Sequence, residues 1–280
     1  MEAAEVTRAV AAATSIATGL GLPVSDTSVR QNSNKLALRL IPGDVLARIG
    51  PAGDGIAQFE VQLARRLAAA GAPVAALDPR VEPRRYQRDG FEVTLWTYYE
   101  PATPLSAAGY AQALRQLHAA MQTIDVPAPH FTDRVADSPG HIARTPALDD
   151  ADRKLLSSRR HDLEQAVLDR GAPEQLLHGE PHPGNLLSTT QGPRFIDLET
   201  CCRGPVEFDL AHVPAPVSEL YPGTDQALLE DCRGLVLAVV AKHRCDPADQ
   251  FPNGHRALRN LLTALRSGPP WPPLDIVMRE

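Results

Sequence analysis

Several features that mark large protein classes are scarce in this chain of 280 residues. Its four cysteines form no C-x2-C pair, which argues against a disulfide-rich secreted domain and against the usual cysteine zinc sites. No apolar run approaches the roughly 20 residues that a membrane-spanning helix requires. The first residues lack the basic start and the continuous apolar stretch of a signal peptide. We therefore expect a cytoplasmic protein with reduced thiols and no membrane partner.

An excess of basic residues is also missing, because 28 Lys and Arg stand against 34 Asp and Glu and give a net charge of -6. Proteins that bind nucleic acids need clustered Lys and Arg against the phosphates, so we expect no nucleic-acid partner. Neither a G-x-G-x-x-G nor a Walker A sequence occurs, so a nucleotide site would have to bind phosphates in another way. The apolar share of 43% and the charged share of 22% are those of an ordinary globular protein.

Strand patterns mark the first hundred residues and helix patterns dominate the rest. In the first part, apolar spacing and Gly, Pro and Asp turns predict a helix over 4–20, a hairpin of 36–41 with 45–49, a helix over 56–70 and a strand over 91–96. In the second part, Ser106 is a predicted N-cap for a helix to Met121, and 186–197 is a small hairpin. This order predicts an α+β fold, with a β-rich lobe over 1–100 and a mainly helical lobe over 101–280.

The most specific pattern is His-Gly-Glu-Pro-His-Pro-Gly-Asn at 178–185, followed by Asp197 at the end of a short apolar run. Glu180 precedes Asn185 by the spacing of the protein-kinase loop H-R-D-x-x-x-x-N, in which the Asp faces the attacking hydroxyl. The Asn and a later Asp of that loop hold Mg²⁺. We therefore predict that Glu180 is catalytic and that Asn185 and Asp197 are metal ligands. A zinc pair of His178 with His182 would need a helix, which the neighbouring prolines forbid.

These residues resemble the aminoglycoside phosphotransferase and choline-kinase-like family, whose loop usually reads H-G-D-x-x-x-x-N and is followed by I-D-x-E/D. Segments 177–187 and 195–199 carry this resemblance, and 204–211 is similar to the family's G-x-P…D-L-A turn. The resemblance implies a protein-kinase-like two-lobe fold. It also implies transfer of the γ-phosphoryl group of Mg²⁺-bound ATP or GTP to a hydroxyl of a small molecule, such as an aminoglycoside, a macrolide, an amino alcohol or a sugar. The chain departs from the family at Glu180, where the usual residue is Asp.

Kinase-like enzymes also need a cation on the third strand, held by a helix carboxylate. Arg48 ends an apolar strand and Glu60 follows in the next predicted helix, so this pair is our candidate for binding the nucleotide phosphates. Without the downstream loop, both would read as surface residues. Arg39, one strand earlier, is the second candidate for the cation.

Two further segments are candidates for nucleotide contacts. Ser33 and Asn34 lie in a polar turn between predicted strands, where backbone N–H groups and a hydroxyl could hold phosphate, although an ordinary hairpin turn fits equally well. Residues Trp96, Thr97 and Tyr99 follow the last strand at the position of a kinase hinge, which implies contacts to the nucleobase. By residue type alone these aromatic side chains would be core.

Glu180 leaves three outcomes open, because its carboxylate lies about one methylene farther from the backbone than that of Asp. In the first, the loop has shifted so that Glu180 orients the substrate hydroxyl normally. In the second, the enzyme is slow, and in the third, the protein binds nucleotide without turnover and acts as a regulator or scaffold. The sequence does not specify the phosphate acceptor, the oligomeric state or a role in antibiotic resistance. Acidic residues of the second half either line a pocket for a cationic substrate or are solvated: Glu207, Asp209, Glu219, Asp225, Glu230 and Asp231.

Overall fold

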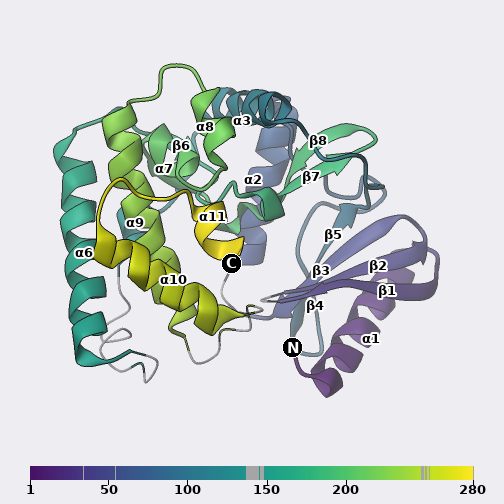
Figure 1. Ribbon diagram of the computed structural model, residues 1–280. Helices are drawn as coiled ribbons and strands as arrows, with labels where there is room; N and C mark the ends of the chain where they lie inside the picture. The colour runs from purple at the N-terminus through teal and green to yellow at the C-terminus, as the bar shows by residue number, and fades with distance from the viewer. Residues whose placement is uncertain are drawn as a thin grey trace. The chain divides into compact units, whose positions relative to one another are not determined.

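The computed structural model describes residues 1–33, 35–53, 55–136, 145, 148–246, 249, 251 and 253–279. The chain divides into two compact units (Figure 1). The first unit comprises Met1–Leu105 with Leu186–Glu199, and the second comprises Ser106–Asn185 with Thr200–Glu280. We describe each unit by itself.

The first unit is built on an antiparallel sheet of five strands in the order β1-β2-β3-β5-β4. Its elements are α1 (Ala3–Gly19), β1 (Val24–Asn32), β2 (Leu36–Pro42), β3 (Val45–Pro51), α2 (Ile56–Ala69), β4 (Tyr86–Arg88), β5 (Phe91–Thr97), β7 (Leu186–Thr189) and β8 (Gly192–Phe195). A short 3-10 helix, η2 (Leu198–Thr200), follows β8. The hairpin and both helices predicted from the sequence are present in this unit.

Helix α1 covers one face of the five-stranded sheet (Figure 1). Alternate residues of β2 and β3 are buried, as expected for strands with one face on a core. The small side chains Ala9 and Ala13 of α1 pack in the same cluster as Leu38 and Ile49. Each of these four side chains is fully buried. The helix therefore fixes the sheet that carries Arg48.

The hairpin β7–β8 groups with the first unit, whereas the boundary expected near residue 100 assigned it to the second part. The reason lies in backbone bonds to the chain between α2 and β4. The amide of Phe195 donates to the Pro73 carbonyl at 2.7 Å, and the amide of Ala75 donates to the Phe195 carbonyl at 2.9 Å. A β-bridge also joins Pro101 to Thr189. These contacts hold Asp197, two residues beyond β8, in the first unit.

The second unit is mainly helical and contains one small two-stranded sheet, β6 with β9. Its elements are α3 (Ala107–Met121), α4 (Phe131–Val135), α6 (Asp150–Asp169), β6 (Gln175–Leu177), a 3-10 helix η1 (Pro183–Asn185), β9 (Cys202–Gly204), α7 (Val206–Leu210), α8 (Ala215–Glu219), α9 (Gln226–Arg244), α10 (Gly254–Ser267) and α11 (Leu274–Arg279). Ser106 caps α3 by accepting the Gly109 amide at 3.1 Å, as predicted. The α+β class with a β-rich first part and a helical second part is confirmed.

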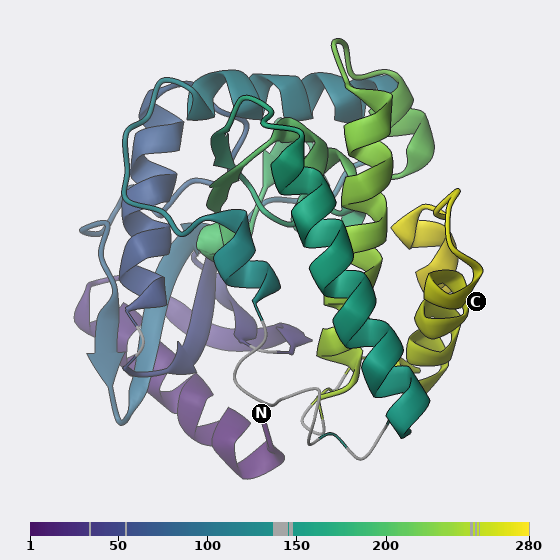
Figure 2. The same ribbon diagram turned by 90° about the vertical axis from the view of Figure 1, so that its left-hand side faces the viewer.

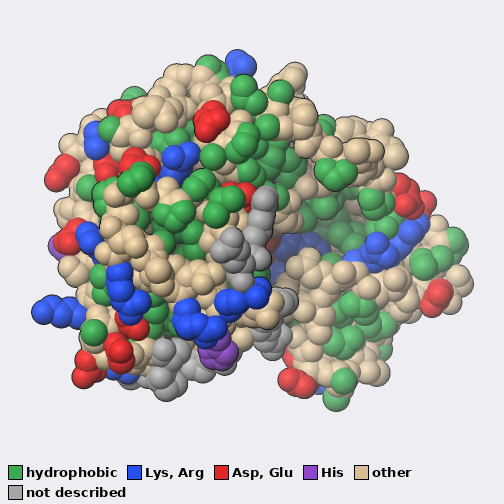
Figure 3. Space-filling model, viewed as in Figure 1, with side chains coloured by type: hydrophobic (Ala, Val, Ile, Leu, Met, Phe, Trp, Pro, Cys, Tyr) green, Lys and Arg blue, Asp and Glu red, His purple; other side chains and the backbone are tan. Residues whose placement is uncertain are grey.

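Helices α6, α9 and α10 pack side by side in the second unit (Figure 2). Helix α10 buries an apolar stripe that includes Leu258, Leu261 and Leu265. Its other face is polar, and basic side chains gather on the surface over this helix (Figure 3). This division is that of an amphipathic surface helix packed on a core. Within the described part of the chain, no helix has the length and apolar character needed to cross a membrane.

Candidate functional site

Arg48 of β3 is the centre of an ion-pair cluster in the first unit. Its Nη1 donates to Glu60 Oε1 of α2, and its Nη2 donates to Asp197 Oδ1 at 2.7 Å and to Glu199 Oε1 at 3.2 Å. The side chain of Glu60 is 1% exposed and that of Arg48 is 16% exposed. The structure therefore brings together Arg48, Glu60 and Asp197, three residues that the sequence predicted for one site. Several carboxylates raise the pKa of Arg48 against the opposing effect of burial, so the guanidinium is charged.

Asp197 has a backbone conformation that few residues other than glycine adopt. Its φ is 66°, in the left-handed region, where Asp and Asn are the tolerated exceptions. The turn continues directly into η2, and the Leu198 amide donates to Glu60 Oε1 at 3.3 Å. Glu60 thus holds both Arg48 and the turn that presents Asp197. Such a backbone outlier is a reason to look for function at the residue.

Glu199, two residues beyond Asp197, has a perturbed carboxyl group. Burial, and then the hydrogen bond and the charge of Asp197, raise the pKa of Glu199 to about 7. Asp197 and Glu199 provide hard oxygen donors, the ligand type that Mg²⁺ prefers. The residues present therefore fit the expected divalent cation. No three His, Cys, Asp or Glu side chains form a metal-binding group within the described residues, and Mg²⁺ usually completes its shell with water and substrate phosphates.

Lys35 is a second cation of this cluster, and sequence reasoning missed it. Its Nζ donates to Glu199 Oε2 at 2.6 Å and lies 3.9 Å from Glu60 Oε2. Arg39, the competing candidate, pairs instead with Asp44 and Glu100, both of which are exposed. Arg39 is therefore not part of the Arg48 cluster. The signal that could have revealed Lys35 is its position beside the polar turn at the start of β2.

The polar turn between β1 and β2 is described only in part. Ser33 is exposed, its Oγ accepts from Gln31 Nε2 at 3.1 Å, and its amide donates to the Lys35 carbonyl at 3.2 Å. Asn34 lies outside the described residues. A phosphate-binding role of Ser33 and Asn34 stays a prediction.

The three predicted hinge residues lie at and after the end of β5. Trp96 is buried, and its Nε1 donates to Thr94 Oγ1 at 2.8 Å. The Thr97 amide donates to the Ala76 carbonyl at 2.9 Å. The Tyr99 hydroxyl accepts the Ala76 amide at 3.1 Å. These bonds fix the segment against the chain that leads into β4, while the predicted nucleobase contacts stay predictions.

In the second unit, the carboxylate of Glu180 is held by a residue that the sequence did not indicate. Arg134 Nη2 of α4 donates to Glu180 Oε1 at 2.7 Å. Lys242 binds the end of α4, because its Nζ donates to the carbonyls of Arg134, Val135 and Ala136 at 3.4, 3.4 and 2.9 Å. Burial raises the pKa of Glu180, but the charges of Arg134 and of nearby histidines together outweigh this effect and lower the pKa below its usual value. Glu180 is therefore a carboxylate at neutral pH.

Asn185 closes the loop that begins at His178. Its Nδ2 donates to the Glu180 carbonyl at 3.0 Å, and its backbone amide donates to the His182 carbonyl at 2.8 Å. With the amide nitrogen facing Glu180, Oδ1 is the atom of Asn185 that can bind a metal. The loop therefore fixes both the backbone of Glu180 and the side chain of Asn185, the predicted metal ligand.

A fully buried carboxylate, that of Asp209 in α7, braces the start of this loop. Asp209 Oδ2 accepts the His178 amide at 2.9 Å, and Oδ1 accepts the Gly179 amide at 2.8 Å. His118 of α3 bonds Oδ2 through Nε2 at 2.9 Å. Burial would raise the pKa of Asp209, but the bond and charge of His118 lower it. The loop thus begins on an ionised carboxylate with fixed partners.

His212 is expected to lower the free energy of unfolding as the pH decreases through about 6.5, because the second unit buries this imidazole in its neutral form. Burial lowers the pKa of His212 from 6.5, and its ring Nδ1 bonds the Phe208 carbonyl at 2.9 Å. Below pH 6.5 the unfolded chain binds a proton at this imidazole that the folded protein does not bind, so His212 favours unfolding in acid. The raised pKa of Glu199 acts in the opposite direction, so the variant comparison isolates the contribution of His212. Urea unfolding at pH 7.5, 6.5 and 5.5 measures this loss, and His212→Asn should reduce it. An equal slope in this variant would contradict the assignment.

Comparison with known proteins identifies the family and the fold of the chain. A model of the phosphotransferase enzyme family (APH) matches residues 30–233. The chain belongs to this phosphotransferase family. A search of curated proteins gives no match to the sequence.

Solved structures similar to this family member include "Amicoumacin kinase hAmiN in complex with AMP-PNP, Ca2+ and Ami", with a TM-score of 0.70 and 11% identity over 98% of this chain and 100% of that one. A thermostable mutant of the aminoglycoside phosphotransferase APH(4)-Ia gives a TM-score of 0.69 and 13% identity over 91% and 98% of the two chains. A putative fructosamine-3-kinase from Thermobifida fusca gives 0.60 and 19% over 91% and 99%. These likenesses confirm the kinase-like fold predicted from the sequence.

Proposed function

We propose that this phosphotransferase moves the γ-phosphoryl group of ATP or GTP to a hydroxyl of a small hydroxylated molecule. The observation that carries the proposal is the cluster in which Arg48 binds Glu60 and Asp197 at the same time. Kinase-like phosphoryl transfer requires a cation on the third strand that is held by a helix carboxylate. It also requires an Asp that can bind Mg²⁺ close to the phosphates. The relatives of similar fold that act on small molecules support the acceptor class.

Each residue has a proposed role in this reaction. Arg48 binds phosphate oxygens, and Glu60 orients its guanidinium. Glu180 accepts a hydrogen bond from the attacking hydroxyl and takes its proton late in the transfer. Asn185 and Asp197 would hold Mg²⁺. When bound, this ion would neutralise negative charge on the phosphoryl group. Lys35 neutralises Glu199 and is a second candidate cation for the phosphates.

One observation favours a second candidate, a nucleotide-binding regulator with little turnover. Glu180 forms an ion pair with Arg134, and a carboxylate with a lowered pKa is a weaker proton acceptor. The two candidates share the nucleotide site and differ only in transfer.

Thermal unfolding with Mg²⁺-ATP and with Mg²⁺-GTP tests the proposal. A ligand that binds only the folded state stabilises it, by about 2.7 kcal/mol at a hundredfold excess over its Kd. We expect an upward shift in Tm that requires Mg²⁺ and is lost in Asp197→Ala. The absence of a shift with either nucleotide at millimolar concentration would contradict both candidates. A shift without phosphoryl transfer to any acceptor in a screen of hydroxylated amines and sugars would favour the regulator.

A further inference from the structure

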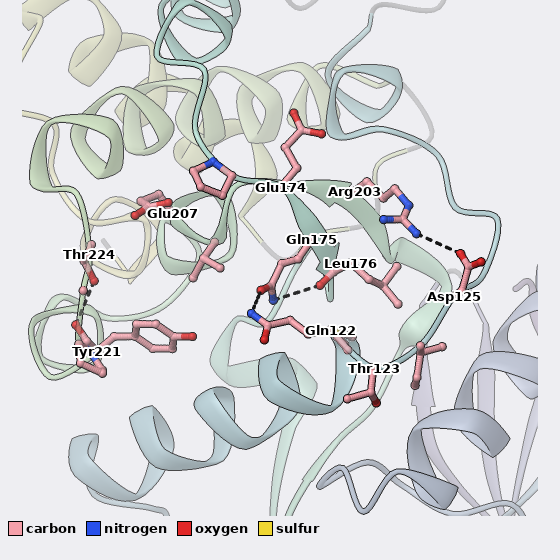
Figure 4. A pocket seen from close by; sticks show the side chains of 16 residues that line it. Gln122, Thr123, Asp125, Glu174, Gln175, Leu176, Arg203, Glu207, Tyr221 and Thr224 are labelled. Atoms are coloured by element: carbon pink, nitrogen blue, oxygen red, sulfur yellow. Dashed lines mark hydrogen bonds and ion pairs between the residues drawn. The ribbon is translucent and has the colours of Figure 1, made fainter.

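A cavity of about 670 Å³ lies in the second unit at the N-terminal end of β6. The loop that begins at His178 follows the opposite end of this strand. Side chains from the end of α3, from β6, from the start of α7 and from the turn before α9 surround it (Figure 4). This volume is typical of small-molecule sites. Gln122, Gln175, Glu207 and Tyr221 supply polar groups around the space (Figure 4).

Glu207 is the unusual side chain of this cavity. It is only 9% exposed, and the bond that the structure gives its carboxylate is from the Asp225 amide to Oε1, at 3.0 Å. Among the described residues no Lys, Arg or His pairs with Glu207. A buried carboxylate without a counter-ion is unfavourable. Arg203 is the one basic side chain of the cavity lining within the described chain, and it faces Asp125 at 3.5 Å.

We propose that this cavity binds a small cationic amine, whose ammonium group pairs with Glu207, and that its occupancy regulates the catalytic loop. The amides of Gln122 and Gln175, which bond each other at 2.6 Å, and the hydroxyl groups of the lining would bind further polar groups of the ligand. Pro173 and Pro222 provide apolar contact on its carbon chain.

A chain of hydrogen bonds, buried from His118 onward, connects the cavity wall to the loop. The Tyr221 hydroxyl lies 2.8 Å from His118 Nδ1, and His118 Nε2 lies 2.9 Å from Asp209 Oδ2. Asp209 is a carboxylate and can only accept, so His118 Nε2–H donates to it and the other ring nitrogen, Nδ1, bonds the Tyr221 hydroxyl. Asp209 in turn accepts the His178 and Gly179 amides, immediately before Glu180. A ligand that holds Tyr221 therefore fixes the orientation of His118 and Asp209.

The cavity is separate from the position of the phosphate acceptor. Gln175 lies three residues before His178 along an extended strand, which corresponds to about 10 Å at roughly 3.3 Å per residue. The cavity lining includes none of residues 178–185, so an amine bound at Glu207 does not lie against the Glu180 carboxylate. The cavity is a second site of the protein, with its own ligand.

Isothermal titration calorimetry with 1,4-diaminobutane, in the absence of nucleotide, tests the binding part. We expect binding at millimolar concentration or below, about tenfold or more weaker in Glu207→Gln because a charge-assisted hydrogen bond is lost. The neutral analogue 1,4-butanediol should bind at least tenfold more weakly. Gln122→Arg, an exposed position on the cavity wall, should abolish diamine binding through repulsion. Gln112→Arg adds the same charge to an exposed position of α3 outside this cavity and should leave binding unchanged.

Equal affinity of the wild type, Glu207→Gln and Gln122→Arg for the diamine would place the amine elsewhere and overturn the proposal, as would equal binding of the diol. Hydrogen exchange of a peptide spanning residues 175–187 tests the regulatory part. The diamine should slow amide exchange at the start of the loop at least twofold in the wild type but not in Tyr221→Phe, which keeps Glu207. No change in the wild type would overturn regulation. None of these measurements requires nucleotide or turnover, so they are independent of the proposed reaction.

Discussion

Gly179→Ala is expected to destabilise the protein by about 3–5 kcal/mol, a large part of the total for an ordinary domain. Gly179 has a φ of 87°, which only glycine adopts without strain. A Cβ at this residue would also lie 2.0 Å from the Thr200 carbonyl oxygen and 2.9 Å from its carbon. Because both contacts are backbone, no side chain can rotate away. Urea unfolding followed by circular dichroism measures the loss.

Gly171→Ala is the matched control for this substitution. Gly171 also has a positive φ, of 57°, but a Cβ there has no neighbour within 4 Å. The control therefore carries only the conformational strain, which is about 1–3 kcal/mol. Equal losses in the two variants would show that the approach of Thr200 to Gly179 contributes nothing. A larger loss in Gly179→Ala would instead explain why the residue before Glu180 is a glycine.

The short-range part of the site is predictable from the sequence. Arg48 and Glu60 lie twelve residues apart on a strand and the next helix, so element order alone places them near each other. The positions of Asn185 and Glu180 follow from a loop whose prolines and glycines forbid a helix. In these segments local chain geometry limits the arrangement to few alternatives.

The long-range partners could not be predicted. Lys35 binds Glu199 across 164 residues, and Arg134 binds Glu180 across 46 residues. The chain has 28 Lys and Arg residues, and no sequence pattern indicates which of them pairs with a given carboxylate. Most charged side chains are solvated, so a basic residue alone does not predict an ion pair. The acidic residues show the same difficulty. Asp231 pairs with Arg170 at 2.7 Å, whereas the buried Glu207 lines a cavity, and only the tertiary structure separates them.

Glu180→Asp is expected to lower kcat by about 100-fold, although it restores the residue that the resemblance to the family implies. The carboxylate of Glu180 is fixed by Arg134 at 2.7 Å, and Lys242 fixes the end of the helix that carries Arg134. Shortening the side chain by one methylene withdraws the carboxylate from this partner. Misplacement of a catalytic group by about 1 Å costs on the order of 10²-fold in rate. The surroundings are therefore built for Glu.

The rate of nucleotide hydrolysis, or of transfer to an acceptor found by screening, measures this effect, with KM determined separately. Because Glu180 is proposed to act on the hydroxyl and not on the nucleotide, the KM for nucleotide should change little while kcat falls. Glu219→Asp, the same shortening at an exposed residue of α8, should leave both unchanged. An equal or higher kcat in Glu180→Asp would mean that the extra methylene is a handicap and that Arg134 restrains the carboxylate from the reaction. In that case the double variant with Arg134→Gln should be faster still, since the shorter carboxylate would then be free to reach the hydroxyl.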